Sequence, residues 1–448
     1  MLPEVPLLEI FAFYVDDAYD GCGWTAWYRL VHVCRKWRDV VFGSPRRLNL
    51  QLTCTPSTPV RERIDAWPLL PILVSCHGPD YEEWGVDNII AVLEHNDRIH
   101  QLELEDYPNS QMEEVLAAMQ QPFPALEDLL LISTSETVVV PASFLSGSAP
   151  RLRTLSLNSI PIPGLPKLLL SATHLQTLDL YDIPHSGYFS PEAMVTALSA
   201  LTNLVTLVIR FKSPRSRPDR RRRPPPPTRT LLPALTCFFF TGVSEYLDDL
   251  VARIDAPLLI QLLITFFHQL IFDTPQLAQF IRCTPKINAL DGAVVRFSDW
   301  SVSVETTDQA YRVLRSTITC RQSDWQLSSL AQVFSTNFTS AIEHLYIEEG
   351  HYPPSWQDDI ETGQWLELLH RLTAVKDLHI SPRFTPRIAP TLKELVGGRA
   401  AEVLPALQTL YLQEKLPSGV QETIDKFVAA RELAGHPIVV SRWEGCRI

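Results

Sequence analysis

A short pattern of hydrophobic positions returns along most of the chain: a hydrophobe, two other positions, a hydrophobe, one other position and a hydrophobe. It begins at residues 99, 126, 152, 175, 204, 235 and 259, so successive copies lie 27, 26, 23, 29, 31 and 24 residues apart. It returns at residues 342, 375 and 407. Each copy alternates like a strand with one buried face, and the spacing leaves room for a return helix or loop. The pattern therefore predicts an α/β fold: a curved, leucine-rich-repeat solenoid over residues 46–448, with a parallel sheet on its concave side and helices and loops on its convex side.

The segments between these motifs complete the prediction. Helices are expected at 112–119, 192–201 and 244–254, and further strands near residues 48, 69 and 436. Between residues 259 and 342 the pattern weakens, and INALDGAVVRF, STITC and WQLSSLAQVF fit as irregular repeats. The alternative is a conventional α/β domain of βα units, because a single copy of the pattern is a weak signal.

Residues 1–45 carry a helical spacing instead. Two apolar stripes share the spacing i, i+3, i+4 and i+7: Leu7, Ile10, Phe11 and Tyr14, and then Trp27, Leu30, Val31 and Cys34. Three short helices are expected here. Because so short a segment cannot bury all of its apolar surface, the stripes are expected to meet either the rest of the chain or a partner, and we favour a partner.

This segment opens LPEVPLLEIF and ends in VHVCRKW, and it resembles the F-box. The matching residues are Leu2, Pro3, Leu7, Ile10, Phe11, Val33, Cys34, Arg35 and Trp37. Val5 stands where the family usually has an acidic residue, and the loop at 16–23 is longer than the usual connection. The resemblance implies docking on the Skp-type adaptor of a cullin-RING ubiquitin ligase. The adaptor-binding residues that it implies are Leu2, Pro3, Leu7, Ile10, Phe11, Leu30, Val33, Cys34 and Trp37.

With its repeats, the whole chain resembles a group of fungal F-box-like proteins with irregular leucine-rich repeats. The alternative for residues 1–45 is an ordinary three-helix cap on the domain that follows.

Composition narrows the class of protein. The formal net charge of -12 and the pI near 5.5 argue against a nucleic-acid partner. The eight cysteines form no C-x-x-C pair, so neither a disulfide framework nor a zinc site is expected. The start of the chain lacks a basic secretory signal, and the apolar run at 257–272 is too short to span a membrane. These features predict a soluble protein of the cytoplasm or nucleus with no membrane partner.

One insertion, at residues 211–230, differs from everything around it. Four arginines at 220–223 are followed by four prolines at 224–227. Like charges repel and consecutive prolines exclude a helix, so a disordered Arg/Pro-rich loop is expected. Its functional alternatives are a nuclear-localisation signal, a contact for an acidic partner and an SH3-type ligand.

Motifs of catalysis are missing from the sequence. It contains no Gly-rich phosphate loop, no G-x-S-x-G elbow and no recognisable pairing of histidine with Ser, Cys or Asp. We therefore predict that the protein is not an enzyme and holds no cofactor or metal.

Binding residues are expected on the concave face, where side chains alternate with the core leucines. The target-binding candidates are Asp179, Tyr181, Arg210, Tyr346, His379 and Tyr411, since aromatic and charged anchors are typical of protein interfaces. The predicted function is the substrate-recognition subunit of an SCF-type ubiquitin ligase, bound through the adaptor to a cullin and acting on an unidentified target by proximity. The alternatives are a leucine-rich-repeat scaffold without a ligase role and an enzyme whose site follows no known motif.

Overall fold

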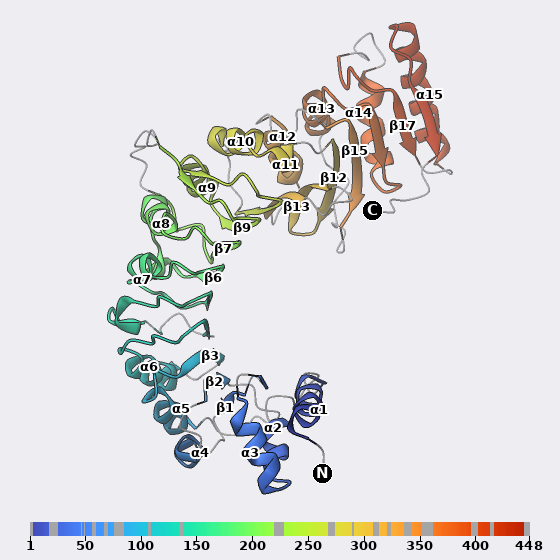
Figure 1. The fold of residues 1–448 in the computed structure, drawn as a ribbon. Helices are drawn as coiled ribbons and strands as arrows, with labels where there is room; N and C mark the ends of the chain where they lie inside the picture. Colours follow the sequence, from blue (N-terminus) through green and yellow to red (C-terminus); the bar gives the residue numbers. More distant parts are fainter. Residues whose placement is uncertain are drawn as a thin grey trace. The chain divides into compact units, whose positions relative to one another are not determined.

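The structure is a computed structural model of the 448-residue chain. It describes residues 3–17, 26–45, 47–48, 50–55, 60–66, 70–75, 85–105, 109–133, 138, 140–218, 228–267, 274–288, 291–307, 313–319, 324–335, 342–350, 362–395, 402–412 and 416–442. The chain forms two compact units. Unit 1 comprises Met1–Tyr188 and Thr196–Leu204, and unit 2 comprises Phe189–Val195 and Val205–Ile448. In each unit the helices that alternate with the strands line one side of the sheet (Figure 1).

Unit 1 begins with three helices and continues with alternating strands and helices. Its elements are α1 (Glu4–Asp17), α2 (Ala26–Val31), α3 (Arg35–Gly43), β1 (Leu52–Cys54), α4 (Val60–Ala66), β2 (Ile72–Ser75), α5 (Val86–Leu93), β3 (Ile99–Glu105), α6 (Asn109–Ala118), β4 (Asp128–Ile132), η2 (Phe144–Gly147), β5 (Thr154–Asn158), α7 (Leu165–Ser171), β6 (Thr177–Ile183) and η3 (His185–Gly187). Helix α8 (Pro191–Leu198) contributes residues to both units.

The strands of unit 1 are parallel and lie in chain order from β1 to β6. Their register places the motif leucines Leu102, Leu129, Leu155 and Leu178 in one row, and each is at most 1% exposed. The leucines of this row form part of the hydrophobic core between the sheet and its helices. The predicted alternation of buried and outward positions along parallel strands is confirmed here.

Unit 2 contains the remaining elements. They are β7 (Thr206–Phe211), β8 (Thr230–Leu231), β9 (Cys237–Gly242), α9 (Ser244–Val251), β10 (Ile254–Asp255), β11 (Gln261–Phe266), α10 (Pro275–Arg282), α11 (Pro285–Asn288), β12 (Gly292–Ser298), β13 (Ser301–Thr307), β14 (Val313–Thr319), α12 (Asp324–Ser335), β15 (His344–Glu349), α13 (Thr362–Arg371), β16 (Asp377–Ile380), α14 (Thr385–Glu394), β17 (Thr409–Leu412), α15 (Ser418–Leu433) and β18 (Val439–Arg442).

The sheet of unit 2 departs from the prediction in its middle. Its strand order is β7-β9-β11-β14-β13-β12-β15-β16-β17-β18, and β13 runs antiparallel to both of its neighbours. The prediction of parallel repeats throughout is therefore wrong between residues 292 and 319. The turn between β12 and β13 contains only Asp299 and Trp300, and so short a connection joins antiparallel strands only. The segment WQLSSLAQVF lies in α12 and is not a strand repeat.

The two ends of the Arg/Pro-rich insertion belong to regular structure. Phe211 ends β7, and Thr230 begins β8, which pairs in parallel with β10 in a small separate sheet. The Arg229 guanidinium lies 3.1 Å from the Asp255 carboxylate, which holds the chain at this point. The expected loop is thus shorter than 211–230, and residues 219–227, with the arginines and prolines, lie outside the described part of the chain.

Aromatic rings fill the core of unit 2 near its first strands. Phe211, Phe240 and Tyr246 are each at most 2% exposed, and the rings of Phe211 and Tyr246 lie 4.7 Å apart. Gly242 ends β9 beside these rings, where a Cβ atom would lie 2.7 Å from the Phe240 ring. Glycine is therefore required by close packing at this position.

Among the helices that the structure describes, none has both the length and the apolar composition needed to cross a membrane.

Candidate protein-interaction sites

The first candidate site is the group of three helices α1–α3, residues 3–44, which we call the helical subdomain. It has a core of its own: Leu7, Phe11 and Leu30 are 4%, 0% and 6% exposed. The Phe11 ring packs edge-on against Trp37 of α3, with ring centroids 4.7 Å apart. The Trp27 indole donates a hydrogen bond of 3.0 Å to the backbone oxygen of Gln51, next to β1. The helical subdomain is thus anchored to the sheet of unit 1.

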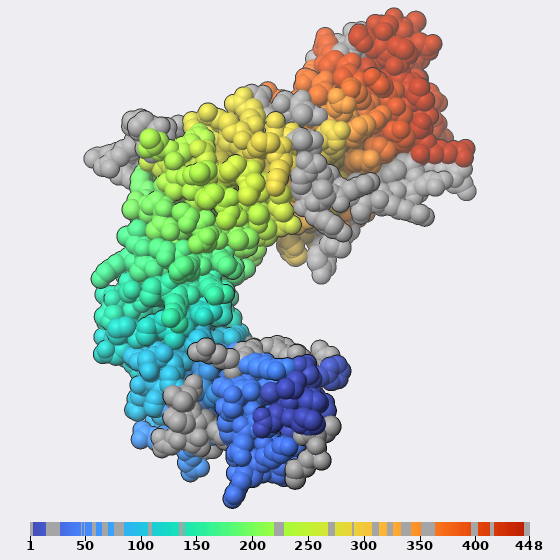
Figure 2. Space-filling model, in the orientation of Figure 1, coloured from blue at the N-terminus to red at the C-terminus, as the bar shows by residue number. Residues whose placement is uncertain are grey.

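A second apolar face of α1 is exposed. Ile10, Phe13 and Tyr14 are 51%, 72% and 38% exposed. At 3.6 residues per turn these three side chains span about 100° of the helix circumference, and the buried Leu7 and Phe11 occupy the adjoining arc beside Tyr14. We call Ile10, Phe13 and Tyr14 the α1 patch. Helix α1 lies at the surface of unit 1, at the dark blue end of the chain (Figure 2).

The predicted adaptor-binding residues divide between core and surface. Pro3, Ile10, Val33 and Cys34 are exposed, Trp37 is half-buried, Leu7, Phe11 and Leu30 are buried, and Leu2 lies outside the described residues. In this conformation the buried residues can only support the surface, because they already fill the space between the helices. Whether the exposed ones bind an adaptor stays a prediction.

Phe13 was missed by sequence reasoning. It lies off the predicted stripe, yet it is the most exposed side chain of the α1 patch. The signal was present in the segment LLEIFAFYV, where Glu9 is the one charged residue and apolar residues cover the other sides of the helix. A helix that is apolar on all sides is normally covered on all sides.

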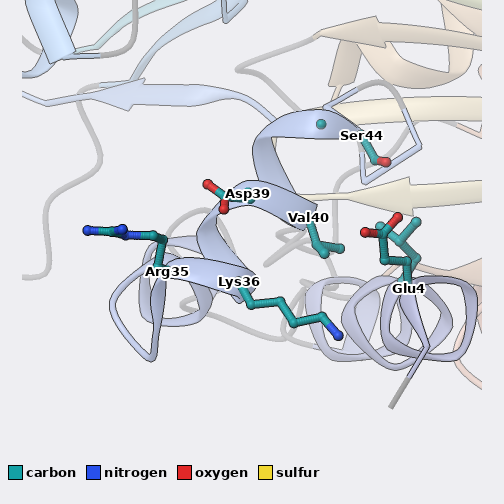
Figure 3. A pocket seen from close by; sticks show the side chains of 8 residues that line it. Glu4, Arg35, Lys36, Asp39, Val40 and Ser44 are labelled. Atoms are coloured by element: carbon teal, nitrogen blue, oxygen red, sulfur yellow. The ribbon is translucent and has the colours of Figure 1, made fainter. Parts of the chain in front are cut away.

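A cleft of about 390 Å³ lies on a different side of α1, where the helix meets α3. Leu8 and Val40 contribute apolar surface to it, and Glu4, Arg35, Lys36 and Asp39 contribute charges of both signs. Glu4 comes from α1 and the other three charged residues from α3; the Lys36 side chain extends toward α1, whereas Arg35 points away from it (Figure 3). This mixture suits a polar contact at the edge of a protein interface better than an apolar ligand.

The second candidate site is on unit 2, on the face of β15–β17 that alternates with the buried leucines. Tyr346, His379 and Tyr411 occupy one row across these strands. Their rings stack: the centroids of Tyr346 and His379 lie 4.1 Å apart, and those of His379 and Tyr411 lie 3.9 Å apart. We call these three residues the aromatic row. Burial lowers the pKa of His379 to about 4, although the nearby Asp377 carboxylate acts in the opposite direction. The imidazole is therefore neutral at pH 7 and stacks as an uncharged ring.

Charged side chains continue this face onto β12–β14. One Glu305 carboxylate oxygen lies 2.9 Å from the Arg296 guanidinium and 2.8 Å from that of Arg315. Arg296 also reaches the Glu348 carboxylate at 3.5 Å. Glu305 and Glu348 are only 13% and 14% exposed, so this network is held in a fixed arrangement. The face offers aromatic groups and ordered charges side by side.

Ring contacts bring three of the six predicted target-binding residues together on unit 2. Tyr346, His379 and Tyr411 lie together. Asp179 and Tyr181 lie two residues apart on β6 of unit 1, and Arg210 is an exposed residue of β7 in unit 2.

Groups for metal or redox chemistry are not gathered anywhere in the described ranges. No three His, Cys, Asp or Glu side chains meet there in a way that could hold a metal ion. The four described cysteines, Cys34, Cys54, Cys237 and Cys283, carry free thiols. Burial raises the pKa of Cys54 to about 11, which keeps this thiol protonated and unreactive.

Comparison with known proteins adds no assignment: no protein family matches the chain, and no curated protein is similar to it.

Proposed function

We propose that this protein is the substrate-recognition subunit of an SCF-type cullin-RING ubiquitin ligase. In this proposal the helical subdomain binds the Skp-type adaptor, and the sheet binds a target protein. The observation that carries the proposal is the α1 patch. An anchored helix presents Ile10, Phe13 and Tyr14 to solvent while the adjoining side chains of Leu7 and Phe11 are buried. The F-box-like residues Pro3, Val33 and Cys34 are exposed on the same helical subdomain.

The size of the α1 patch is consistent with a contribution to binding. Fully burying a large apolar side chain contributes about 1.5–3 kcal/mol, so three partly exposed ones would contribute roughly 2–5 kcal/mol. Association costs roughly 4–15 kcal/mol, so Val5 and Val33, which are 62% and 58% exposed, would have to add to the interface. The cleft between α1 and α3 would supply polar contacts at its edge.

Target binding is the second part of the proposal. The aromatic row and the ordered Arg296–Glu305–Arg315 network give unit 2 the anchors from which protein interfaces are built. A receptor of this kind acts by proximity and needs no catalytic group of its own. Its place of action would be the cytoplasm or the nucleus, where such ligases work.

The test is co-expression of the full chain with a Skp-type adaptor, followed by affinity purification of the chain. We expect the wild-type chain to retain the adaptor and the double variant Ile10→Glu, Phe13→Glu to lose it. Leu433→Glu is the matched control, because Leu433 is 90% exposed and lies in unit 2. Failure of the wild-type chain to retain the adaptor, or full retention by the double variant, would contradict the proposal.

A second candidate function is a protein-interaction scaffold whose three helices only cap the sheet. The packing of Phe11 on Trp37 and the hydrogen bond from Trp27 to Gln51 favour it, since both serve the fold of unit 1. A scaffold would bind its target through unit 2 and retain no adaptor, whichever residue occupies position 13.

A further inference from the structure

The last strand of unit 2, β18, ends the sheet in an unusual way. It pairs in parallel with β17, and no other described strand lies on its second side. Val440 is in register with Leu410, which is 1% exposed, yet Val440 itself is 42% exposed. Val439, on the other face, is 63% exposed. Both faces of this edge strand therefore carry apolar side chains in contact with solvent, a combination that natural sheet edges generally avoid.

The backbone of β18 has donors and acceptors directed outward. The Val439 amide donates to the Gln408 backbone oxygen, so the backbone N–H of Val439 is directed toward β17. In a parallel ladder alternate residues bond to opposite neighbours, and the Val440 amide is therefore directed toward the open side. Groups of this kind are satisfied by an extended backbone that lies alongside them.

The aromatic row adds a side-chain preference. Tyr346, His379 and Tyr411 stack across three successive strands, and the next position in the row, on β18, is Ser441. One face of the Tyr411 ring lies against His379, so its other face is turned toward β18. A hydroxymethyl group cannot cover that ring face. A large ring reaching over Ser441 from an added strand would continue the stack.

We propose that the outer edge of β18 accepts an extended segment of another protein as an additional strand, with an aromatic side chain of that segment over Ser441 and against Tyr411. The segment would carry apolar side chains beside Val439 and Val440. A second copy of β18 fits less well, because residues 436–442 contain no Tyr, Trp or Phe and Pro437 limits the length of a paired edge. The proposal does not depend on adaptor binding, since the helical subdomain belongs to unit 1 and β18 to unit 2.

The experiment selects binders for the full-length protein from a phage library of random nonapeptides, with counter-selection on Val440→Pro. Proline at this position removes the outward amide but leaves the bonds to β17 in place. Enriched peptides are then synthesised, and their affinity is measured by fluorescence polarisation. We expect every binder to contain Tyr, Trp or Phe and to bind Val440→Pro at least about tenfold more weakly. Val440→Thr keeps the amide and serves as the matched control, with affinity within about twofold of wild type.

Two further variants test the stacking separately from the edge. Replacing the aromatic residue of the peptide by alanine should weaken binding about 2- to 10-fold, the effect of one aromatic pair. Ser441→Tyr should weaken peptide binding by a similar factor, because the introduced tyrosine ring would then stack on Tyr411. This variant stays informative if thermal denaturation shows that Val440→Pro is not folded. The proposal would be overturned if no peptide is enriched, if binders lack aromatic residues, or if Val440→Pro and Ser441→Tyr bind like wild type. It would equally be overturned if light scattering shows a dimer of the wild-type chain that Val440→Pro dissociates.

Discussion

Replacing Arg431 by methionine should destabilise unit 2 strongly, although the residue lies on a helix near the end of the chain. Its side chain is 0% exposed. One guanidinium nitrogen, Nη1, donates to the backbone oxygens of Val403 and Leu404, both at 3.2 Å. Nη2 donates to the Leu407 oxygen at 3.3 Å, and Nε to the His436 oxygen at 3.2 Å. A single side chain thus holds the loop before β17 and the turn after α15.

The magnitude follows from these four bonds. Hydrogen bonds to a charged group contribute about 1.5–3 kcal/mol each, roughly 6–12 kcal/mol for four. Burying the guanidinium costs several kcal/mol, and the same burial lowers the Arg431 pKa. The difference, about 3–5 kcal/mol, is the expected loss for Arg431→Met. In a unit of this size each kcal/mol lowers the melting temperature by roughly 2–4 °C.

The assay is thermal and urea unfolding of the full-length variant, followed by circular dichroism. Arg431→Lys should be intermediate, because a single ammonium group keeps the charge but cannot reach all four oxygens. Lys426→Met, which removes an exposed pair with Glu422, should change stability by less than about 0.5 kcal/mol. If Arg431→Met unfolds within about 1 kcal/mol of wild type, the four bonds do not hold this end of the sheet as described.

Two further predictions concern the candidate sites. Phe11→Ala should lower the free energy of unfolding of unit 1 by about 3–5 kcal/mol, because Phe11 is 0% exposed. Ile10→Ala, at a side chain that is 51% exposed, should lower it by less than about 1 kcal/mol. Equal effects of the two variants in urea denaturation would contradict the division of α1 into core and surface. His379, with its pKa lowered to about 4, stays neutral in the folded protein while the unfolded chain binds a proton below pH 6.5, so its contribution to stability is lost as pH falls from about 6.5 to 4. His379→Gln should remove this part of the pH dependence. If the His379 imidazole of the folded wild-type protein titrates by NMR with a midpoint near pH 6.5, the prediction is wrong.

The repeats were predictable because their strands are short, regular and covered on one face. Leu155 and Leu157 are both buried and separated by an outward residue, the alternation that the motif encodes. The antiparallel strand β13 could not be predicted in this way. Its sequence SVSVETT alternates like any half-buried strand, and alternation carries no information about strand direction. Only the length of the turn at Asp299 and Trp300 indicates the hairpin.

The end of the sheet shows a second limit of sequence reasoning. Arg431 would normally be placed on a solvated helix face, since arginine is almost never buried alone. Its acceptors Leu404 and Val403 lie 27 and 28 residues earlier, so the contact exists only once the last repeat has formed. No local pattern could have identified it.

For the helical subdomain, spacing predicted helices but could not determine which face is buried. Phe11 and Phe13 are both apolar and two residues apart, yet one is 0% and the other 72% exposed. The difference in exposure arises because Phe11 contacts Trp37, which belongs to another helix. The aromatic row was predicted correctly as three outward residues, whereas their stacking depends on the register of β15–β17.

The most direct test of the proposed function is calorimetric titration of the full-length chain with a purified Skp-type adaptor. We expect saturable one-to-one binding that Phe13→Ala weakens roughly 6- to 40-fold, the loss of about 1–2 kcal/mol of apolar burial at a side chain that is 72% exposed, while Leu433→Ala binds like wild type. Absence of saturable binding by the wild-type chain, or an affinity of Phe13→Ala within about twofold of wild type, would contradict it.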